Sequence, residues 1–148
     1  MKKYFKKYKK NHISIITVTL NAEKTLERTI KSVLKQSYKN FELIIIDGGS
    51  NDKTLNIIKK YNKKISYWVS ENDKGIYHAM NKGIKKSSGN IIGILNADDY
   101  YTKNALKIVN KYFNKYRNIE FLFGSVKKNR VMSGFYPEKI SNRFNIYP

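Results

Sequence analysis

The sequence has no cysteine, only two prolines and no long apolar run among its 148 residues. Without cysteine the chain forms neither disulfides nor thiolate metal sites, and it has no cysteine nucleophile. No apolar run approaches the roughly 20 residues that a membrane-spanning helix needs, and the N-terminus lacks the apolar core of a signal peptide. We therefore expect a cytoplasmic protein that would contact the cell membrane only peripherally, from its inner face.

Two common glycine motifs of nucleotide-binding proteins are also missing. No GxGxxG follows the first predicted strand, and no GxxxxGK[ST] occurs in the chain. These absences argue against a dinucleotide-type Rossmann site and against a P-loop. A Ser-His-Asp arrangement is poorly supported, because His12 lies at the start of a predicted strand and His78 inside a predicted helix.

Acidic residues are few. Thirty Lys and Arg face eleven Asp and Glu, which gives a formal net charge of +19. Such a charge attracts nucleic acid, anionic lipid or phosphorylated substrates. Most of the excess is lysine, whereas arginine, which dominates specific base contacts, is scarce, so nucleic acid is not the expected partner. In the densest basic block, Met1–Lys10, aromatic residues alternate with lysines, which suits either an anionic membrane surface or a solubilising tail.

The length and the 41% of hydrophobic residues suit one domain, which we place at residues 12–148 behind a basic extension at residues 1–11. Runs rich in β-branched residues predict strands at 12–20, 41–46, 65–70, 91–95 and 119–123, and a weaker run predicts one more at 130–135. Amphipathic helices are predicted between the first five strands, with Asn21 capping the first helix and Ser50 or Asn51 the second. The alternation predicts an α/β fold with a mostly parallel, doubly wound sheet.

The run Ile91–Leu95, which we expect to be buried, is followed at once by Asn96, Ala97, Asp98 and Asp99. Adjacent carboxylates at the end of a buried strand repel each other, so a cation is expected beside them. One interpretation is a divalent metal, because Mg²⁺ and Mn²⁺ prefer carboxylate oxygens. The other is that Asp98 or Asp99 caps the helix that follows. The two residues alone do not distinguish these interpretations.

Three further polar clusters also follow predicted strands directly, at Thr19–Asn21, Asp47–Asp52 and Glu71–Lys74. In a parallel sheet all strands end at one edge, and ligands bind outside that edge. The four clusters are therefore expected to converge. This convergence favours a metal or phosphate site over simple helix capping.

Four segments, in this order and spacing, resemble the nucleotide-sugar-binding half of the family 2 glycosyltransferases with a GT-A fold: ISIITVTLN, FELIIIDGGSNDKT, SENDKGIYHAMNKGI and GILNADDYY. The third segment is especially similar to members that build bacterial surface polysaccharides. The resemblance covers residues 12–124 and implies a Rossmann-like three-layer sandwich. The implied reaction is inverting transfer of a sugar from a nucleoside diphosphate, with UDP favoured, to a hydroxyl of a saccharide or a lipid-linked acceptor.

The resemblance also implies roles for single residues. Those that it assigns to the nucleotide sugar are Thr19, Asn21, Asp47, Asp73, Lys74, Asn96 and Asp98. Asp47 matches the acid that accepts a hydrogen bond from the base ring, and Lys74 would offset diphosphate charge. Asp98 fits the last Asp of the family's DxD motif and would hold Mn²⁺ or Mg²⁺ against the diphosphate, with Asp99 as a second ligand.

Two features depart from the family pattern. Asn96 stands where the motif has its first Asp, which removes one negative charge beside the metal. The family's acceptor pocket and general base follow the part that corresponds to Phe123–Gly124, and the only acid of this chain beyond Gly124 is Glu138. We therefore expect a domain truncated at its C-terminus, with the base beyond Pro148 and weak or no transfer.

The alternative function is that of a non-catalytic basic module that binds nucleotides or nucleic acid. An unprotected sheet edge at the truncated end would favour a homodimer.

Overall fold

The structure, a computed structural model, describes residues 11–116, 118–124, 126–128 and 131–133. The chain divides after Ile108 into two compact units, residues 1–108 and 109–148, and each is described by itself. The basic block at residues 1–10 and the acid Glu138 lie outside the described residues.

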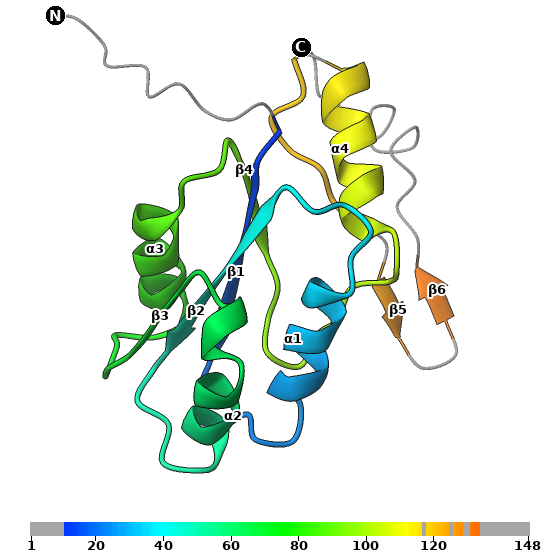
Figure 1. Cartoon of the computed structure of the whole chain (residues 1–148). Coiled ribbons are helices and arrows are strands. Elements are labelled where there is room, and N and C mark those ends of the chain that lie inside the picture. The colour runs from blue at the N-terminus through cyan, green and yellow to red at the C-terminus, as the bar shows by residue number, and fades with distance from the viewer. Residues whose placement is uncertain (1–10, 117, 125, 129–130, 134–148) are drawn as a thin grey trace, which may run out of the picture. The chain divides into compact units, whose positions relative to one another are not determined.

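Strands and helices alternate along the first unit (Figure 1). Its elements are β1 (Ile13–Thr19), α1 (Leu26–Leu34), β2 (Phe41–Asp47), α2 (Thr54–Lys60), the 3₁₀ turn η1 (Asn62–Lys64), β3 (Tyr67–Ser70), α3 (Ile76–Lys86), β4 (Ile91–Ile94) and the start of α4 (Ala105–Lys115). The strands lie in the order β3-β2-β1-β4, and all neighbouring pairs are parallel. The predicted parallel α/β fold is confirmed.

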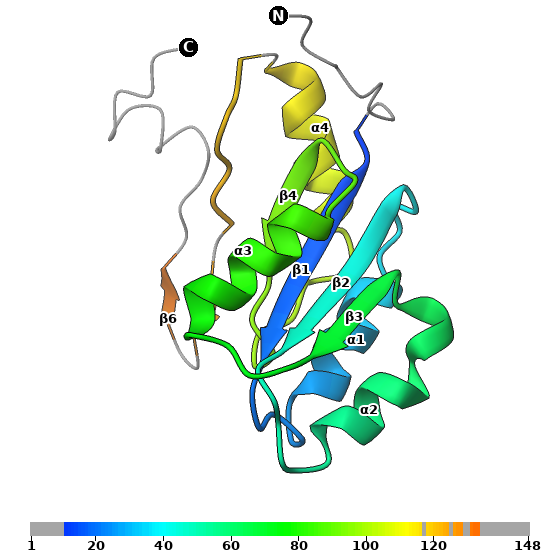
Figure 2. The same cartoon turned by 90° about the vertical axis from the view of Figure 1, so that its left-hand side faces the viewer.

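Helices cover both faces of this sheet, α3 on one side and α1 with α2 on the other (Figures 1 and 2). On the α3 side, Ala79 packs with the central strands, where Ile16 and Ile44 are fully buried. Gly83 allows the helix to come this close, because a Cβ at that position would collide with the side chain of Ile16. The result is a three-layer α/β/α arrangement around β1 and β2.

The opposite side of the sheet is covered by the apolar stripe of α1. Leu26, Ile30 and Val33 recur at helical spacing and are fully buried, and Ile58 of α2 joins them. Fully burying such a side chain contributes roughly 1.5–3 kcal/mol. These side chains therefore hold both helices on the sheet.

One expectation about burial is wrong at β4. The run that contains it was predicted to be buried, yet Ile92 and Ile94 are 42% and 40% exposed. The reason is topological. β4 is an edge strand, and α3 packs on β1 and β2 rather than over β4.

Both predicted helix caps are wrong. α1 begins at Leu26, five residues after Asn21, and Lys53 rather than Ser50 or Asn51 precedes the first residue of α2. Asn21 and Ser50 instead hold the loops together, as described below. Their hydrogen-bonding groups face neighbouring loops and not free helix ends.

In the second unit, β5 (Val126–Lys128) pairs antiparallel with β6 (Val131–Ser133). β6 lies inside the weak strand predicted at residues 130–135, whereas β5 was not predicted. The strand predicted at residues 119–123 is wrong, because this segment pairs with no strand among the described residues. A strand needs partners for its backbone groups, and here Phe121 and Phe123 stay exposed.

Within the part of the chain that the structure describes, no helix has the length and apolar character needed to cross a membrane.

Candidate functional site

The carboxyl ends of the strands meet at one edge of the sheet. Thr19 at the end of β1 pairs with Asp47 at the end of β2, and Asp47 pairs with Ser70 at the end of β3. β4 ends at Ile94, and the chain continues from it into Asn96–Asp99. The predicted convergence of four polar loops at this edge is therefore confirmed.

Asp47 is fully buried at this edge and shapes the loop after β2. Its Oδ2 accepts hydrogen bonds from the N–H groups of Gly49 (3.2 Å) and Ser50 (2.9 Å) and from the hydroxyl of Ser70 (2.6 Å). Its Oδ1 accepts a further bond from the Ser50 hydroxyl. Such donors make burial of a carboxylate possible. The predicted bond from a nucleobase would have to reach Oδ1, which accepts only one of these bonds.

Asn21 joins the loop after β1 to the loop after β2. Its backbone is in the left-handed region, with φ of 49°, which asparagine tolerates better than most residues. Its N–H donates to the Ser50 hydroxyl (2.8 Å), and its side-chain oxygen accepts from the N–H of Asn51 (3.0 Å). The two loops therefore form one connected layer.

The loop after β3 lies against the glycines of the loop after β2. A Cβ at Gly48 would lie 2.9 Å from Oδ2 of Asp73. A Cβ at Gly49, where φ is +86°, would collide with the side chain of Asn72. The other oxygen of Asp73 accepts a bond from the N–H of Gly75 (2.7 Å). Asp73 is thus held beside the Gly48 backbone.

Lys74 follows on the same loop and is exposed. Its N–H donates to Nδ1 of His78 (3.2 Å), one turn into α3. The imidazole therefore supports the loop that carries the lysine, and the Lys74 ammonium remains at the edge.

The acidic residues after β4 sit in a tight turn. The N–H of Asp99 donates to the carbonyl of Asn96 (3.1 Å). Asp98 and Asp99 are both exposed, and neither carboxylate forms an ion pair with any described residue. α4 begins at Ala105, so neither acid caps it, and the capping interpretation is wrong.

Sequence reasoning missed how α1 supports this turn. The Thr29 hydroxyl lies within hydrogen-bonding distance of the carbonyls of Ala97 (2.8 Å) and Asp99 (2.6 Å). Nη2 of Arg28 donates to the carbonyl of Asp98 (2.8 Å). These bonds occupy the backbone of the turn and leave its two carboxylates free.

The same side of α1 continues to bind the chain beyond the turn. Ser32 accepts a bond from the N–H of Tyr101 (3.0 Å), and the fully buried Gln36 bonds to the backbone of Thr102 and Leu106. Polar residues at positions 29, 32 and 36 keep helical spacing, although Gln36 lies two residues beyond the end of α1, and this spacing is the signal that would have revealed the contact. We call Arg28, Thr29, Ser32 and Gln36 the α1 polar stripe.

Three buried polar atoms at or near the edge have no hydrogen-bond partner among the described residues. They are the hydroxyls of Thr17 and Thr19 and the side-chain oxygen of Asn96. An unsatisfied buried polar group costs about 1–3 kcal/mol, so such groups usually face a ligand or water. Thr19 and Asn96 are both predicted site residues. Thr17 lies inside β1, as predicted.

A divalent metal fits the turn only together with oxygen atoms of a ligand. No group of three His, Cys, Asp or Glu side chains that could hold a metal occurs in the described ranges. Mg²⁺, however, is commonly held by one or two carboxylates plus substrate phosphates. Asp98 and Asp99 offer two free carboxylates, and Asn96 offers an unpartnered oxygen. The residues present therefore suit a metal that arrives with a diphosphate.

Sequence comparisons agree with this arrangement. A family profile described as Glycosyl transferase family 2 matches residues 14–146. WfgD of Escherichia coli, named as a glucosyltransferase from UDP-Glc to GlcNAc-diphosphoundecaprenol, is 34% identical over 134 residues, which cover 87% of this chain and 53% of WfgD. An uncharacterized glycosyltransferase of Mycobacterium tuberculosis H37Rv is 40% identical over 91 residues, which cover 61% of this chain and 35% of that protein. The chain spans about half or less of the length of these relatives.

Solved structures of two glycosyltransferases are also similar to this chain. TarS of S. aureus in complex with UDP-GlcNAc has a TM-score of 0.66 at 28% identity, covering 71% of this chain and 32% of the TarS chain. The mannosyltransferase PcManGT of Pyrobaculum calidifontis, solved with GDP-Man and Mn²⁺, has a TM-score of 0.65 at 21% identity, covering 80% of this chain and 36% of its own. The second likeness concerns the fold alone.

Proposed function

Because this chain belongs to glycosyl transferase family 2 and has the GT-A fold, we propose that it binds a nucleoside-diphosphate sugar at the carboxyl edge of its sheet. The observation that carries the proposal is the outward-facing acidic turn. α1 binds the backbone carbonyls of the turn, and the carboxylates of Asp98 and Asp99 remain free at the point where three other polar loops meet.

In this proposal the diphosphate and a Mn²⁺ or Mg²⁺ ion bind together. Asp98 is the principal metal ligand, Asp99 the second, and the oxygen of Asn96 faces the same group. A metal supplies a Lewis acid that stabilises the negative charge on the departing diphosphate. Lys74 adds a positive charge near the phosphates.

The nucleoside occupies the rest of the edge. Thr19, with its unpartnered buried hydroxyl, and Asn21 line its pocket, and Asp73 bonds to the ribose. Asp47 holds the loop against which the base packs. We favour UDP because WfgD is named for UDP-Glc and TarS was solved with UDP-GlcNAc.

The full reaction would be inverting transfer of the sugar to an acceptor hydroxyl in polysaccharide or glycoconjugate synthesis. WfgD is named for a lipid-diphosphate acceptor, and we propose an acceptor of the same class, a saccharide carried on a lipid. Asp98, Asp99 and Asp73 are committed to the donor in this scheme. The donor-binding step is therefore the part of the reaction that the described residues can perform.

The test is calorimetric titration of the chain with UDP, GDP and ADP, with and without Mn²⁺. We expect Mn²⁺-dependent binding of UDP that falls at least about tenfold in Asp98→Ala, since even indirect support of a metal is worth 10- to 100-fold. Asp98 is exposed and its side chain makes no bond in the described structure, so the melting temperature should not change.

Asp99→Ala is the matched variant, and we expect a smaller loss of affinity from it. Binding that is absent, or that is the same in wild type and Asp98→Ala, would contradict the proposed site.

A further inference from the structure

Among the described residues of the first unit, the excess of positive over negative charge is greatest on the α1–α2 side. This side carries exposed lysines, which are Lys24, Lys31, Lys35, Lys53, Lys59, Lys60, Lys63 and Lys64. Arg28 adds a ninth cation, and the acids among these residues are Glu23, Glu27 and Asp52. We call the surface formed by these eight lysines, Arg28 and the three acids the basic face.

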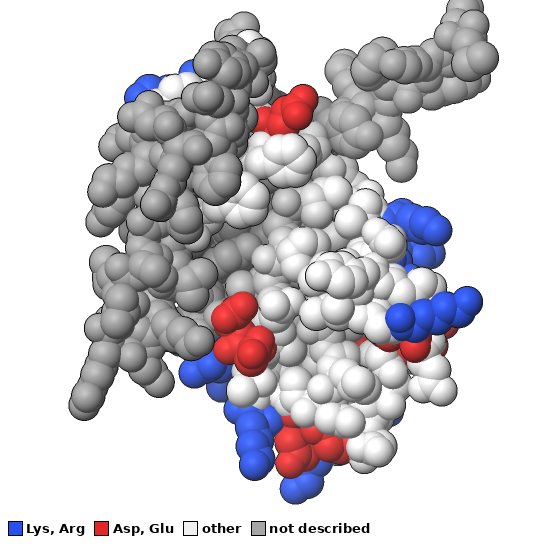
Figure 3. Space-filling model, turned by 180° about the vertical axis from the view of Figure 1, so that it is seen from behind, with Lys and Arg blue, Asp and Glu red and all other residues white. Residues whose placement is uncertain are grey.

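Among its described residues, the side of the molecule that faces away from the viewer in Figure 1 carries little charge. Figure 3 shows mostly uncharged surface wherever described residues are visible, with Lys and Arg only toward its margins. Exposed apolar side chains occur on α3 and β4, among them Ile84 and Ile92. Seven lysines lie elsewhere among the described residues of the first unit, but six acids accompany them, so the excess positive charge lies mainly on the α1–α2 side.

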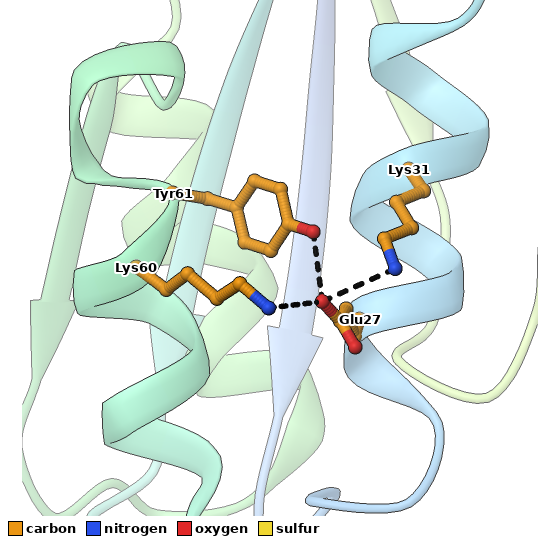
Figure 4. A network of polar contacts seen from close by, with 4 residues as sticks. All are labelled: Glu27, Lys31, Lys60 and Tyr61. Carbon is orange, nitrogen blue, oxygen red and sulfur yellow. Dashed lines mark hydrogen bonds and ion pairs between the residues drawn. The ribbon is translucent and has the colours of Figure 1, made fainter.

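The three acids within the basic face offset only part of its charge, because the face carries nine cations. Glu27 pairs with Lys60 (2.8 Å) and Lys31 (3.2 Å) and also accepts a bond from Tyr61 (Figure 4). Glu23 and Asp52 accept bonds from backbone N–H groups of the neighbouring loops. Apart from Lys31 and Lys60, the lysines of the basic face form no ion pair with any described residue.

Two open hollows lie on this face, side by side along α1. One, of about 390 Å³, is lined by Lys24, Lys53 and Lys60 together with Asn56 and Ile57. The other, of about 440 Å³, is lined partly by Lys31 and Lys35. Glu23 lines both hollows and Glu27 lines the second, but in each the basic side chains outnumber the carboxylates, which favours an anionic headgroup.

We propose that the basic face docks on a bilayer that contains anionic lipids. Clusters of four to eight basic residues bind such membranes, and each lysine near the surface contributes about fivefold in affinity. Lys24 and Lys53 follow Asn21 and Asp52 in the loops of the sheet edge, so a docked chain holds that edge beside the membrane. The proposal rests on the distribution of charge and does not depend on the proposed donor site.

A bilayer fits this face better than nucleic acid does. Its cations are lysines with one exception, whereas base recognition favours arginine. Single strands also need exposed aromatic rings for stacking, and the Tyr61 ring on this face is only partly exposed and bound to Glu27.

The test is co-sedimentation of the full chain with vesicles of phosphatidylcholine alone or with 30–40% phosphatidylglycerol, roughly the range in which surface charge is strong. The variant Lys24→Gln/Lys53→Gln/Lys59→Gln removes three unpaired charges from the basic face and leaves the Glu27 contacts intact. The control Lys39→Gln/Lys85→Gln/Lys107→Gln removes the same charge elsewhere and keeps residues 1–10. We expect the first variant to lose at least about tenfold in affinity for the anionic vesicles and the control to lose much less.

Equal losses in the two variants would mean that net charge alone attracts the chain, and would overturn the proposal. So would wild-type binding by the first variant. Binding of single-stranded RNA that weakens in the first variant, with vesicle binding unchanged, would assign the face to nucleic acid instead. Because none of the substituted lysines belongs to the proposed donor site, UDP binding should stay the same in both variants, which separates this test from the previous one.

Discussion

Glu27 shows how one carboxylate on the surface can connect two helices. It lies on α1 and receives bonds from Lys60 and Tyr61, both at the end of α2, while Lys31 approaches from the next turn of its own helix (Figure 4). The hydrogen bond from Lys60, with those from Tyr61 and Lys31, lowers the pKa of Glu27 from 4.5 to about 2. The charged form is therefore the one that the folded chain stabilises.

This shift predicts a definite pH window. Since the pKa is lower in the folded state than in the unfolded one, Glu27 stabilises the fold at pH values above about 4.5 and loses this effect as the pH falls to about 2. We expect Glu27→Gln to lower the melting temperature at pH 6, and the gap between variant and wild type to narrow steadily below pH 4.5. Thermal melts of both proteins from pH 2 to 7 measure this, and a gap independent of pH would refute it.

Single residues also show what a sequence can and cannot reveal. Asp98 was predicted as a metal ligand because two acids directly follow an apolar run and the family resemblance matches it to the DxD motif, and its carboxylate forms no ion pair with any described residue. Asn21 was misread as a helix cap, because its partners, Ser50 and Asn51, are some thirty residues away in the chain. For Asp47 the sequence indicated a site residue, but the donors that surround it depend on how its own loop folds and on the pairing of β2 with β3, which brings Ser70 to it.

Among the helices, α1 does more than cover the sheet. Its apolar stripe packs inward, while the α1 polar stripe binds the chain from Ala97 to Leu106. The guanidinium of Arg28 also lies over the ring of Tyr100, 4.6 Å from its centroid. One rigid helix thereby sets the conformation of the acidic turn before any ligand binds, so the turn does not have to be ordered at the moment of binding.

Arg28→Met tests this role, because methionine keeps most of the side-chain length but removes the donor and the charge. The lost bond to the Asp98 carbonyl is worth about 1 kcal/mol, so the amides of residues 96–101 should exchange hydrogen roughly five times faster. Affinity for UDP with Mn²⁺ should fall as well. The control is Lys35→Met, which replaces an exposed lysine at the C-terminal end of the same helix. This variant should leave the hydrogen-exchange rates unchanged. Equal exchange in wild type and Arg28→Met would contradict the role.

The strands and helices of the first unit were predictable because their apolar periodicity is local. β1 and β2 agree with their predicted ranges to within about one residue, and α3 lies between the third and fourth strands, as predicted. The error at residues 119–123 has another cause. The segment has the composition of a strand, but composition does not supply a partner strand. The exposure of Ile92 could not be foreseen either, because it depends on how far α3 extends across the sheet.

For the first unit as a whole, the four-stranded sheet has two edges of different character. β3 is half-buried along its length, whereas β4 exposes Ile92 and Ile94 on one face. Within the described sheet the outer side of β4 has no neighbouring strand. An apolar edge strand without a partner tends to pair with another chain.

We therefore predict self-association that depends on β4. Sedimentation velocity should show a concentration-dependent dimer for wild type, and Ile94→Lys should shift it to monomer, because a lysine on an edge strand disfavours pairing. Ile84→Lys on α3 is the matched control, since Ile84 is 42% exposed and Ile94 40%. A similar shift in both variants, or a wild type that stays monomeric throughout, would speak against pairing through β4.

The register of the central strands has a consequence for how this chain can change over evolutionary time. β1 and β2 pair without a bulge from Ile13 and Phe41 to Thr19 and Asp47. Deleting one residue within β2 would draw Asp47 back by about 3.3 Å and turn its side chain to the other face. Lineages that keep this site can exchange apolar side chains of similar volume along β1 and β2, but they cannot shorten or lengthen either strand by a single codon.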